Sequence, residues 1–162
     1  MIDWYYIEKH GFTITTNPEK INFKRLHYFL AFESYWAKNI PLDLLKKACL
    51  NSINFSLLES ATNRFIGFAR IITDRAVFAY LADVFIDSNY RGKGLGKWLI
   101  ETIKSYPDVE SLRIFYLMTK DAHSLYNQFG WKPLEKPEMS MMIRKQSVDI
   151  YPPLNKDDYK IN

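Results

Sequence analysis

A short turn rich in glycine and positive charge is the part of the sequence whose chemistry is easiest to infer. Three glycines alternate with other residues over positions 92–96, between an apolar run and the start of a helical pattern. Glycine lets the backbone turn sharply, so successive N–H groups can point into one concavity. The helix N-terminus adds the positive end of its dipole, and Arg91, Lys93 and Lys97 add full charges. The turn therefore predicts a binding site for a pyrophosphate group.

Two well-known phosphate motifs do not match this turn. The Walker A pattern needs glycine where this chain has Arg91, and Ser or Thr where it has Trp98. The dinucleotide motif G-x-G-x-x-G needs its last glycine at the position of Lys97. A tight strand-to-helix turn that binds nothing is the alternative reading. Three glycines and three cations within residues 91–97 favour a ligand instead.

Runs of alternating and apolar residues predict the elements that position the turn. Apolar–polar alternation indicates a strand over residues 12–16, and apolar residues at helical spacing follow the turn. Short polar links between three consecutive strand-like runs favour antiparallel hairpins. The expected strands are 12–16, 55–59, 65–73, 78–86, 111–118 and 139–144, and the expected helices are 23–36, 41–51, 95–106 and 121–129. This order predicts a mixed α/β fold (α+β) around one sheet.

Four residues are expected to bound these helices. Pro41 suits a first helical position, and Pro107 ends the helix that follows the glycine turn. Asp121 is placed to act as the N-cap of the last helix, and Gly130 follows as its C-terminal stop.

The run 78–86 is expected to be a central strand, because both of its faces are mainly apolar. Strict alternation directs one set of side chains to one face and the other set to the opposite face. These sets are Tyr80, Ala82, Val84 and Ile86, and Leu81, Asp83 and Phe85.

The composition fits one domain with a sizeable core. The chain has 162 residues, of which 48% are hydrophobic and 16% aromatic. Its 22 basic residues exceed its 18 acidic residues by four, and the two signs are interleaved along the chain. A nucleic-acid-binding domain usually gathers its basic residues on one face, so we expect no nucleic-acid partner.

The cysteine and histidine content limits the kinds of site that the protein can contain. The single cysteine, Cys49, excludes an intramolecular disulfide and a thiolate metal cluster, and it is expected to be a buried, inert thiol. His10, His27 and His123 are too dispersed to indicate a metal site, so no metal is expected. We see no signal peptide and no membrane span, and therefore expect a cytoplasmic protein without a membrane partner. Monomer and homodimer both remain possible.

The turn resembles motif A of the GNAT (Gcn5-related N-acetyltransferase) superfamily, which is written R/Q-x-x-G-x-G/A. Arg91, Gly94 and Gly96 match that motif, and Ile86 ends the preceding strand five residues earlier. The later segment Leu125–Trp131 is similar to motif B, commonly L-Y-x-x-x-G-F, with Trp131 in place of the usual Phe. Both motifs at this separation form a specific signal, and the order of elements resembles the family over nearly the whole chain.

This resemblance implies a GNAT domain over residues 1–146, followed by a polar tail over 147–162. The implied fold has a central, mostly antiparallel sheet that splays at the cofactor cleft, with helices on both faces. The implied cofactor is acetyl-CoA as acyl donor. Its pantetheine would bind the exposed backbone of Val84, Phe85 and Ile86. Its pyrophosphate would bind at Arg91, Gly92, Lys93, Gly94, Leu95, Gly96 and Lys97.

The reaction implied by the resemblance is direct attack of a primary amine, on a small molecule or a peptide, on the acetyl thioester. Tyr126 matches the tyrosine with which many members protonate the departing thiolate. A phenol of pKa about 10 is protonated at neutral pH and can donate that proton. The alternative is that Tyr126 is a core aromatic only, since it lies on the apolar side of its predicted helix.

The amine must lose a proton, because an amine of pKa about 10.4 is neutral in only about one molecule in 2,500 at pH 7. Asp83 is the first candidate base, since it directly precedes the expected cofactor stretch; a purely structural role is the alternative. Glu33 and His123 are further candidates. The family sets its acceptor specificity with the first two helices and their loop, so Glu33, Tyr35 and Trp36 are expected at the acceptor. The alternative for the two aromatic residues is a place in the core, as is common for aromatics at helical spacing.

Two other functions remain open on the sequence alone. A non-catalytic module of the same fold could bind and sense acyl-CoA, because no base is obvious. A nucleic-acid-binding domain is the third and weakest reading.

Overall fold

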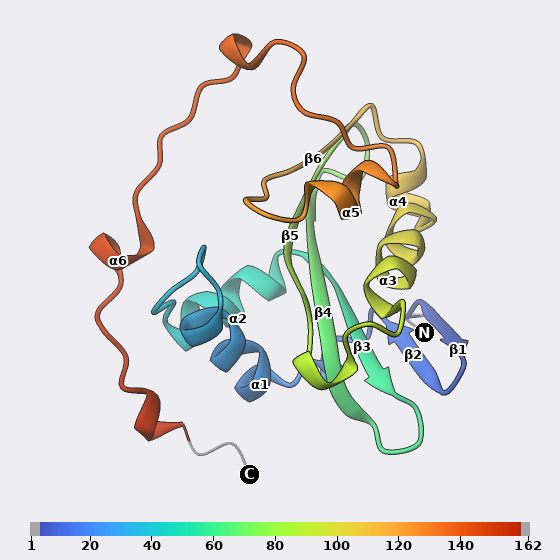
Figure 1. Ribbon diagram of the computed structural model, residues 1–162, viewed down its shortest axis with the longest axis vertical. Coiled ribbons are helices and arrows are strands. Elements are labelled where there is room, and N and C mark those ends of the chain that lie inside the picture. Colours follow the sequence, from blue (N-terminus) through green and yellow to red (C-terminus); the bar gives the residue numbers. More distant parts are fainter. Residues whose placement is uncertain (1–3, 160–162) are drawn as a thin grey trace.

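The chain forms one six-stranded sheet with helices on both of its faces, as Figure 1 shows. The structure is a computed structural model that describes residues 4–159. The strands lie across the sheet in sequence order, and every neighbouring pair is antiparallel except β5 and β6, which are parallel. They are β1 (Tyr6–Lys9), β2 (Phe12–Thr15), β3 (Ile53–Glu59), β4 (Arg64–Thr73), β5 (Phe78–Ile86) and β6 (Ile114–Leu117).

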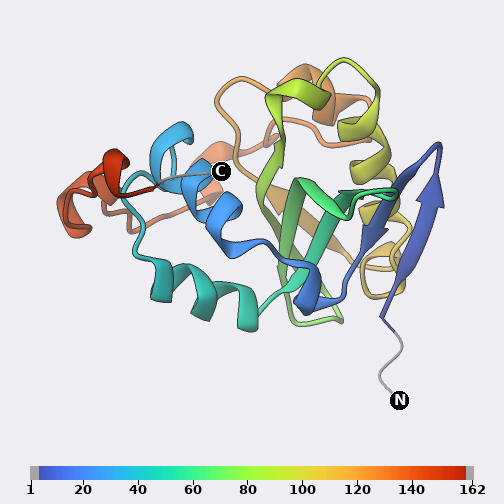
Figure 2. The same cartoon turned by 90° about the horizontal axis from the view of Figure 1, so that it is seen from below.

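The helices form two layers with the sheet between them, which is clearest in Figure 2. The longer ones are α1 (Phe23–Tyr28), α2 (Leu42–Leu50) and α3 (Leu95–Lys104). The shorter ones are α4 (Pro107–Glu110), α5 (His123–Asn127) and α6 (Ser147–Ile150). Single turns lie at η1 (Pro18–Lys20), η2 (Phe29–Glu33, a π-helical turn), η3 (Ser88–Tyr90), η4 (Pro137–Met139) and η5 (Lys156–Asp158). No helix within residues 4–159 is both long and apolar enough to span a bilayer.

Two hydrophobic clusters hold the layers together, one on each face of the sheet. The first joins α3 and α4 to the sheet through residues such as Trp98, Leu99 and Ile103. The second joins α1, η2 and α2 to the sheet and includes the stacked rings of Phe29 and Phe85, whose centroids lie 4.1 Å apart. Cys49 belongs to this second cluster, and burial raises the pKa of its thiol to about 11, as expected for an inert thiol.

The predicted mixed fold with helices on both faces is confirmed, and so are the strands that carry an apolar pattern. The sequence missed β1, whose residues Tyr6–Lys9 are mostly exposed and have no apolar periodicity. This strand exists because it pairs with β2 along its whole length, from Tyr6 opposite Thr15 to Lys9 opposite Phe12. An exposed edge strand is held by main-chain hydrogen bonds to its neighbour, so the pattern of its side chains does not predict it.

The strict alternation predicted for β5 is wrong, because a β-bulge interrupts the strand. Phe68 of β4 pairs with Phe85 while Arg70 pairs with Ala82, so β5 holds one extra residue between these pairs. Asp83 lies in this bulge with a φ of 55°, in the left-handed region. A bulge shifts the following side chains to the other face. Leu81 therefore packs with one hydrophobic cluster and Phe85 with the other.

The first helix is shorter than the predicted range 23–36. Regular α-helix ends at Tyr28, a π-helical turn follows to Glu33, and Ser34 is extended. The Ser34 hydroxyl donates to the Leu30 carbonyl at 2.6 Å and accepts from the Ala37 amide at 3.2 Å. These bonds turn the chain, so residues 34–36 leave the helix.

Three expectations about helix ends need correction. Pro41 is the N-cap of α2 and not its first residue, and α3 ends at Lys104, before Pro107 opens α4. The predicted N-cap Asp121 is wrong, because Ala122 occupies that position without a side-chain cap. The Thr119 hydroxyl accepts from the Ala122 amide at 3.0 Å instead. Gly130 follows α5 with a φ of 96°, as expected for a helix stop.

The predicted last strand over residues 139–144 is wrong, because Met139 ends the turn η4 and no strand of the described sheet pairs with the residues that follow. Residues 140–146 have no regular secondary structure. The tail beyond them lies on the surface and contains α6 and η5.

Replacing Gly67 tests how closely β4 and β5 approach. An added Cβ would lie 2.9 Å from Ile86 Cδ1 and 3.0 Å from the Phe85 carbonyl oxygen, which is part of the backbone. We expect Gly67→Ala to lower the free energy of unfolding by about 1–3 kcal/mol, measured by denaturant unfolding.

Gly96→Ala is the matched control, because its Cβ would meet only Ile86 Cγ1 at an ordinary 3.7 Å. Alanine also favours a helix, so the control should leave stability unchanged or raise it by up to about 1 kcal/mol. Equal stability of both variants would contradict the close approach at Gly67.

Candidate functional site

The sheet opens between β5 and β6, next to the glycine turn. The two strands pair only from Phe78 opposite Ile114 to Leu81 opposite Leu117. Beyond Leu81, β5 continues to Ile86 with no β6 partner. The main chain of residues 82–86 is therefore unpaired on the β6 side. This is the stretch that contains the expected pantetheine contacts Val84, Phe85 and Ile86.

The glycine turn presents free main-chain amides at the start of α3. Gly92 and Gly94 both have a φ of 76°, and Gly94 is the N-cap of α3. The Arg91 amide donates to the Ser88 carbonyl at 3.4 Å, and the Trp98 amide donates to the Gly94 carbonyl at 3.0 Å. Between these two, none of the amides of residues 92–97 has an acceptor in the described part of the chain. The predicted set of free amides is thus present except for that of Arg91.

Open space surrounds this turn. A Cβ added at Gly92 or at Gly94 would meet no atom within 4 Å. The turn is exposed on its outer side, and Lys97 points into solvent from the first turn of α3. A phosphate group has room to approach these amides, and the dipole of a ten-residue helix favours it there.

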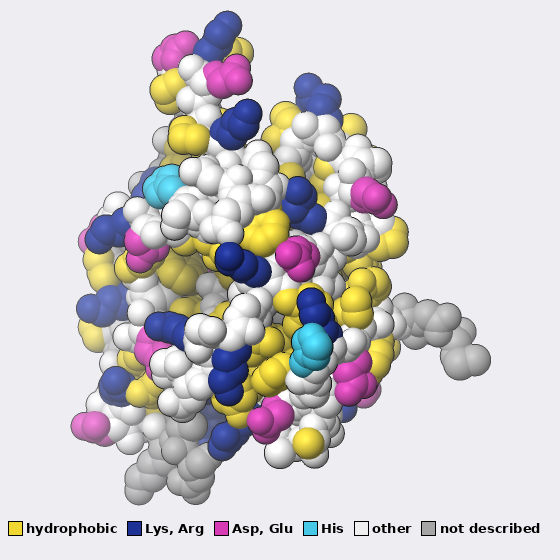
Figure 3. Space-filling model, turned by 45° about the vertical axis from the view of Figure 1, so that its right-hand side comes forward, with side chains coloured by type: hydrophobic (Ala, Val, Ile, Leu, Met, Phe, Trp, Pro, Cys, Tyr) yellow, Lys and Arg dark blue, Asp and Glu magenta, His cyan; other side chains and the backbone are white. Residues whose placement is uncertain are grey.

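The side chains of Lys93 and Arg91 in the glycine turn make different contacts. The Lys93 ammonium lies 5.1 Å from the centroid of the Tyr90 ring. The Arg91 Nε–H donates to the Ile86 carbonyl at 3.1 Å, so this side chain folds back on β5. Figure 3 shows the face that carries α3 and the β1–β2 hairpin, where Lys and Arg side chains surround a recess with a hydrophobic floor.

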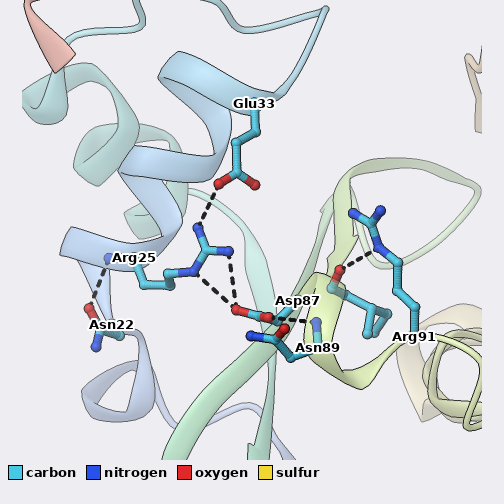
Figure 4. A network of polar contacts seen from close by, with 7 residues as sticks. Asn22, Arg25, Glu33, Asp87, Asn89 and Arg91 are labelled. Carbon is cyan, nitrogen blue, oxygen red and sulfur yellow. Dashed lines mark hydrogen bonds and ion pairs between the residues drawn. The ribbon is translucent and has the colours of Figure 1, made fainter. Parts of the chain in front are cut away.

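An ion-pair network joins the end of β5 to the first helix, as Figure 4 shows. Arg25 donates through Nε and Nη2 to Asp87 Oδ2, at 3.3 and 3.1 Å. Its Nη1 lies 3.4 Å from Glu33 Oε1. Asp87 also accepts from the Asn89 amide at 3.0 Å and thereby begins η3. Arg25 thus fixes the first residue after β5, from which the glycine turn starts.

Asp83 is buried between a cation and an indole. Arg70 Nε donates to Asp83 Oδ2 at 2.8 Å, and Trp36 Nε1 donates to Asp83 Oδ1 at 3.0 Å. Arg70 also donates to the Ser52 hydroxyl at 3.1 Å. The Asp83 side chain is 8% exposed. These contacts hold the bulge of β5 in place. Asp83 therefore has a structural role, and its hydrogen bonds go to the side chains of Arg70 and Trp36 and not to neighbouring backbone.

The residues expected at the acceptor lie on the segment that follows η2. Trp36 reaches β5 through its bond to Asp83, and the Tyr35 hydroxyl accepts from the Lys120 amide at 2.9 Å. The segment therefore connects β5 to the loop between β6 and α5. Glu33 lies apart from these two contacts and pairs with Arg25. The third candidate base, His123, is an exposed residue at the start of α5.

Tyr126 lies on α5 with its ring against Trp131, at 5.8 Å between centroids. Its side chain is buried, and its hydroxyl has no hydrogen-bond partner among residues 4–159. Burial raises the pKa of Tyr126 to about 12, and the negative charge of the Asp121 carboxylate adds to this effect. The phenol is therefore protonated at neutral pH and has its proton free to donate.

Comparison with known proteins agrees with this geometry. A model of the acetyltransferase (GNAT) domain family matches residues 52–133, about half of the chain. The solved structure of a GNAT-family protein from Xanthomonas campestris pv. campestris is 34% identical in sequence. It superposes with a TM-score of 0.82 over 87% of this chain and 98% of that chain. The chain belongs to the GNAT family of acetyltransferases.

Other relatives extend this GNAT assignment. The Porphyra purpurea protein ycf52, named an uncharacterized N-acetyltransferase, is 32% identical over 120 residues, which are 72% of this chain and 68% of its own length. A GNAT acetyltransferase from Elizabethkingia anophelis, solved with acetyl-CoA bound, is 14% identical. It has a TM-score of 0.54 over 78% of this chain and 80% of that chain, and shares the fold.

Sequence reasoning missed the residues that connect the GNAT motifs to the rest of the fold. Arg25 and Asp87 are 62 positions apart, and Arg70 meets Asp83 across a pair of neighbouring strands. No sequence motif identifies an arginine that forms an ion pair with a residue distant in the chain. Arg70 carried one signal in the sequence, since it is a charged residue in the middle of an apolar strand. A buried charge needs a partner of opposite charge, so this position indicated an ion pair but not which residue completes it.

Removing the carboxylate of Asp83 tests its structural role. Asp83→Ala leaves Arg70, which is 14% exposed, without its counter-ion. We expect the free energy of unfolding to fall by about 3–5 kcal/mol, measured by chemical denaturation.

Asp108→Ala is the control for this change, because it breaks the exposed pair with Arg75, whose side chains are 62% and 29% exposed. The control should cost less than about 1 kcal/mol. If Asp83→Ala cost no more than the control, the ion pair could not be what holds the bulge.

Proposed function

We propose that this GNAT protein transfers an acetyl group from acetyl-CoA to a primary amine, on a small molecule or on a peptide. The observation that carries the proposal is the run of free amides over residues 92–97 at the start of α3. It directly follows the strand whose last five residues lack a partner on one side. A donor with a linear amide-bearing arm and a pyrophosphate fits both features together.

The residues of the turn suit the pyrophosphate of this donor. Up to six amides can donate to its oxygens, and Lys93 and Lys97 supply charge beside them. Arg91 uses only Nε in its bond to Ile86, so its two terminal nitrogens are available without breaking that bond. The bound acetyl-CoA of the Elizabethkingia anophelis neighbour, which shares the fold, supports the same donor here.

Tyr126 is the proposed acid that protonates the departing thiolate. Its hydroxyl proton is free, and its raised pKa keeps the phenol neutral over the whole range in which the protein would work. In this reaction the acceptor amine attacks the thioester carbonyl directly, the C–N bond forms and the C–S bond breaks. The departing thiolate takes the Tyr126 proton and leaves as the thiol of CoA.

Asp83 is the proposed acceptor of the amine's proton, directly or through water. Each of its oxygens accepts one hydrogen bond, from Arg70 or from Trp36, and so keeps a second lone pair. Tyr35 and Trp36 would border the acceptor beside it. Glu33, which pairs with Arg25, is proposed at the outer part of the acceptor site.

A sensing module without turnover is the second candidate, and the ion pair of Asp83 favours it. The carboxylate of Asp83 is already paired with the buried Arg70, so an acceptor amine would have to compete with that arginine for it. Release of free thiol from acetyl-CoA across a panel of primary amines distinguishes the two functions. Tight acetyl-CoA binding with no thiol release for any amine would support the sensing module.

Reversing one charge at the turn tests the pyrophosphate site. Lys93→Glu places a carboxylate beside the phosphates, and we expect it to raise the Kd for acetyl-CoA by about tenfold or more in calorimetry. Gly94→Val should weaken binding further. Its cost comes from the positive φ of 76° and not from crowding, because the space at its Cβ is open.

Lys46→Glu is the charge-matched control, since Lys46 lies on α2, on the other side of the sheet from α3. It should bind acetyl-CoA like the unaltered protein. Normal binding by both turn variants would place the donor elsewhere, and no binding by the unaltered protein at near-saturating acetyl-CoA would end the proposal.

Tyr126→Phe removes the proposed acid. We expect kcat to fall by about 100-fold or more while the Kd for acetyl-CoA is unchanged. Because the pKa of Tyr126 is about 12, the unaltered enzyme should show no loss of rate from deprotonation of Tyr126 between pH 7 and 10.

Tyr106→Phe is the control, since Tyr106 is a partly buried phenol whose ring packs against Phe55 and Tyr5 and which lies on neither family motif. Its kcat should be unchanged. Full activity of Tyr126→Phe would remove that residue from the mechanism.

A further inference from the structure

Two tyrosines lie side by side on β5 and β6, next to the point where these strands part. Tyr80 is opposite Tyr116 in the register, and the centroids of their rings lie 5.9 Å apart. The residues that follow them, Leu81 and Leu117, pack with the hydrophobic cluster that contains α3. Because side chains alternate along a strand, both tyrosines point to the opposite face, which carries α1, η2 and α2. We call these two rings the tyrosine platform.

The hydroxyls at this platform reach solvent. Within residues 4–159, the buried side-chain oxygens without a hydrogen-bond partner are Asn54 Oδ1 and Ser56 Oγ. The hydroxyls of Tyr80, Tyr116 and Tyr126 also have no partner in that part of the chain, so they must be accessible. A ligand can therefore reach the platform and the proposed acid from the same side.

Carboxylates act on both of the phenols that a ligand would meet. Burial raises the pKa of the Tyr80 phenol, and the nearby Asp83 carboxylate adds to this effect. The Asp121 carboxylate acts in the same direction on Tyr126. A group that binds between Tyr80 and Tyr126 therefore lies in the field of two negative charges.

The neighbouring cations leave the faces of the platform free. Arg70 is paired with the carboxylate in the bulge of β5, and the Lys120 ammonium lies 5.8 Å from the centroid of the Tyr35 ring. In the part of the chain that the structure describes, no Lys or Arg lies over the ring of Tyr80 or of Tyr116. The face of an aromatic ring attracts a cation, and more strongly where water is excluded. The platform therefore suits an organic cation.

Tyr35 restricts access to the platform. Its hydroxyl accepts from the Lys120 amide at 2.9 Å, which joins the segment after η2 to the loop between β6 and α5. These two segments approach each other in both ribbon views (Figure 1 and Figure 2). The Tyr35 phenol lies near those of Tyr80 and Tyr126. A peptide chain would have to displace this bridge to reach them, whereas a small molecule would not.

We propose that Tyr80 and Tyr116 bind the acceptor as a small primary alkylammonium ion and that the Tyr35 bridge excludes peptides. This inference rests on the proposed acetyl transfer and names the class of its acceptor. A primary alkylamine is a cation at neutral pH, and the rings bind that form before Asp83 takes its proton. The rings supply the attraction, so Asp83 does not have to leave Arg70 in order to recognise the acceptor.

Calorimetry at about pH 7 with CoA present tests recognition of the cation without any transfer. Butylamine is the probe, and butan-1-ol, of similar size but uncharged, is the control ligand. We expect butylamine to bind with a Kd at least about tenfold lower than that of butan-1-ol. Equal binding of the two would overturn the proposal.

Two replacements of Tyr80 separate its ring from its hydroxyl. Tyr80→Leu removes the ring and should raise the KM for butylamine by about tenfold or more. An unchanged Kd for acetyl-CoA checks that this variant folds. Tyr80→Phe keeps the ring and should change that KM by less than about threefold.

Tyr116→Leu repeats the ring test on β6 and should also raise the KM for butylamine. Tyr6→Leu is the matched control, since Tyr6 is a strand tyrosine on β1 that is 63% exposed, and its KM should be unchanged. An unchanged KM in Tyr80→Leu and Tyr116→Leu would overturn the proposal.

A blocked tripeptide with a central lysine presents the same butylamine group on a peptide chain, so it isolates the effect of the bridge. We expect kcat/KM for butylamine to exceed that for the peptide by about tenfold or more, and Tyr35→Ala to narrow this ratio. Selective binding of butylamine without thiol release from acetyl-CoA would contradict the transfer and support the cation site. Thiol release that is equal with butylamine and with the peptide would support the transfer and overturn the proposal.

Discussion

The parting of β5 from β6 is the constraint on which the rest of the site depends. The two strands pair over four residues, and β5 then continues alone to Ile86. Unpaired main chain inside a sheet is costly unless water or a ligand satisfies it. The bulge at Asp83, held by Arg70 and Trp36, lies in this unpaired half of β5. The glycine turn and α3 directly follow β5. The free amides of residues 92–97 therefore lie next to the part of β5 that has no partner strand.

Polar contacts connect the two sides of this opening. Arg25 fixes Asp87 at the end of β5, while Trp36 and Tyr35 tie the segment after η2 to β5 and to the loop before α5. The first helix thus reaches the proposed donor side, and the segment that follows it reaches the proposed acceptor side.

Residue type and short-range spacing predicted those parts of the structure that depend only on neighbouring residues in the sequence. The glycine turn, α3 and the apolar strands follow from residue type and spacing. The extra residue in β5 could not be predicted, because a bulge is defined by the register with β4. β1 forms by pairing alone, and Arg25 and Asp87 meet only after folding. The segment 139–144 shows the opposite failure, since its apolar residues suggested a strand but no strand of the described sheet pairs with it.

Amide chemical shifts during a titration with CoA test the central claim most directly. The account places the diphosphate on main-chain N–H groups of residues 92–97, so these amide protons should move downfield and saturate together as hydrogen bonds form. Amides of α2, on the other side of the sheet, should not move. Saturation with CoA that leaves residues 92–97 unshifted, while amides elsewhere respond, would contradict the account.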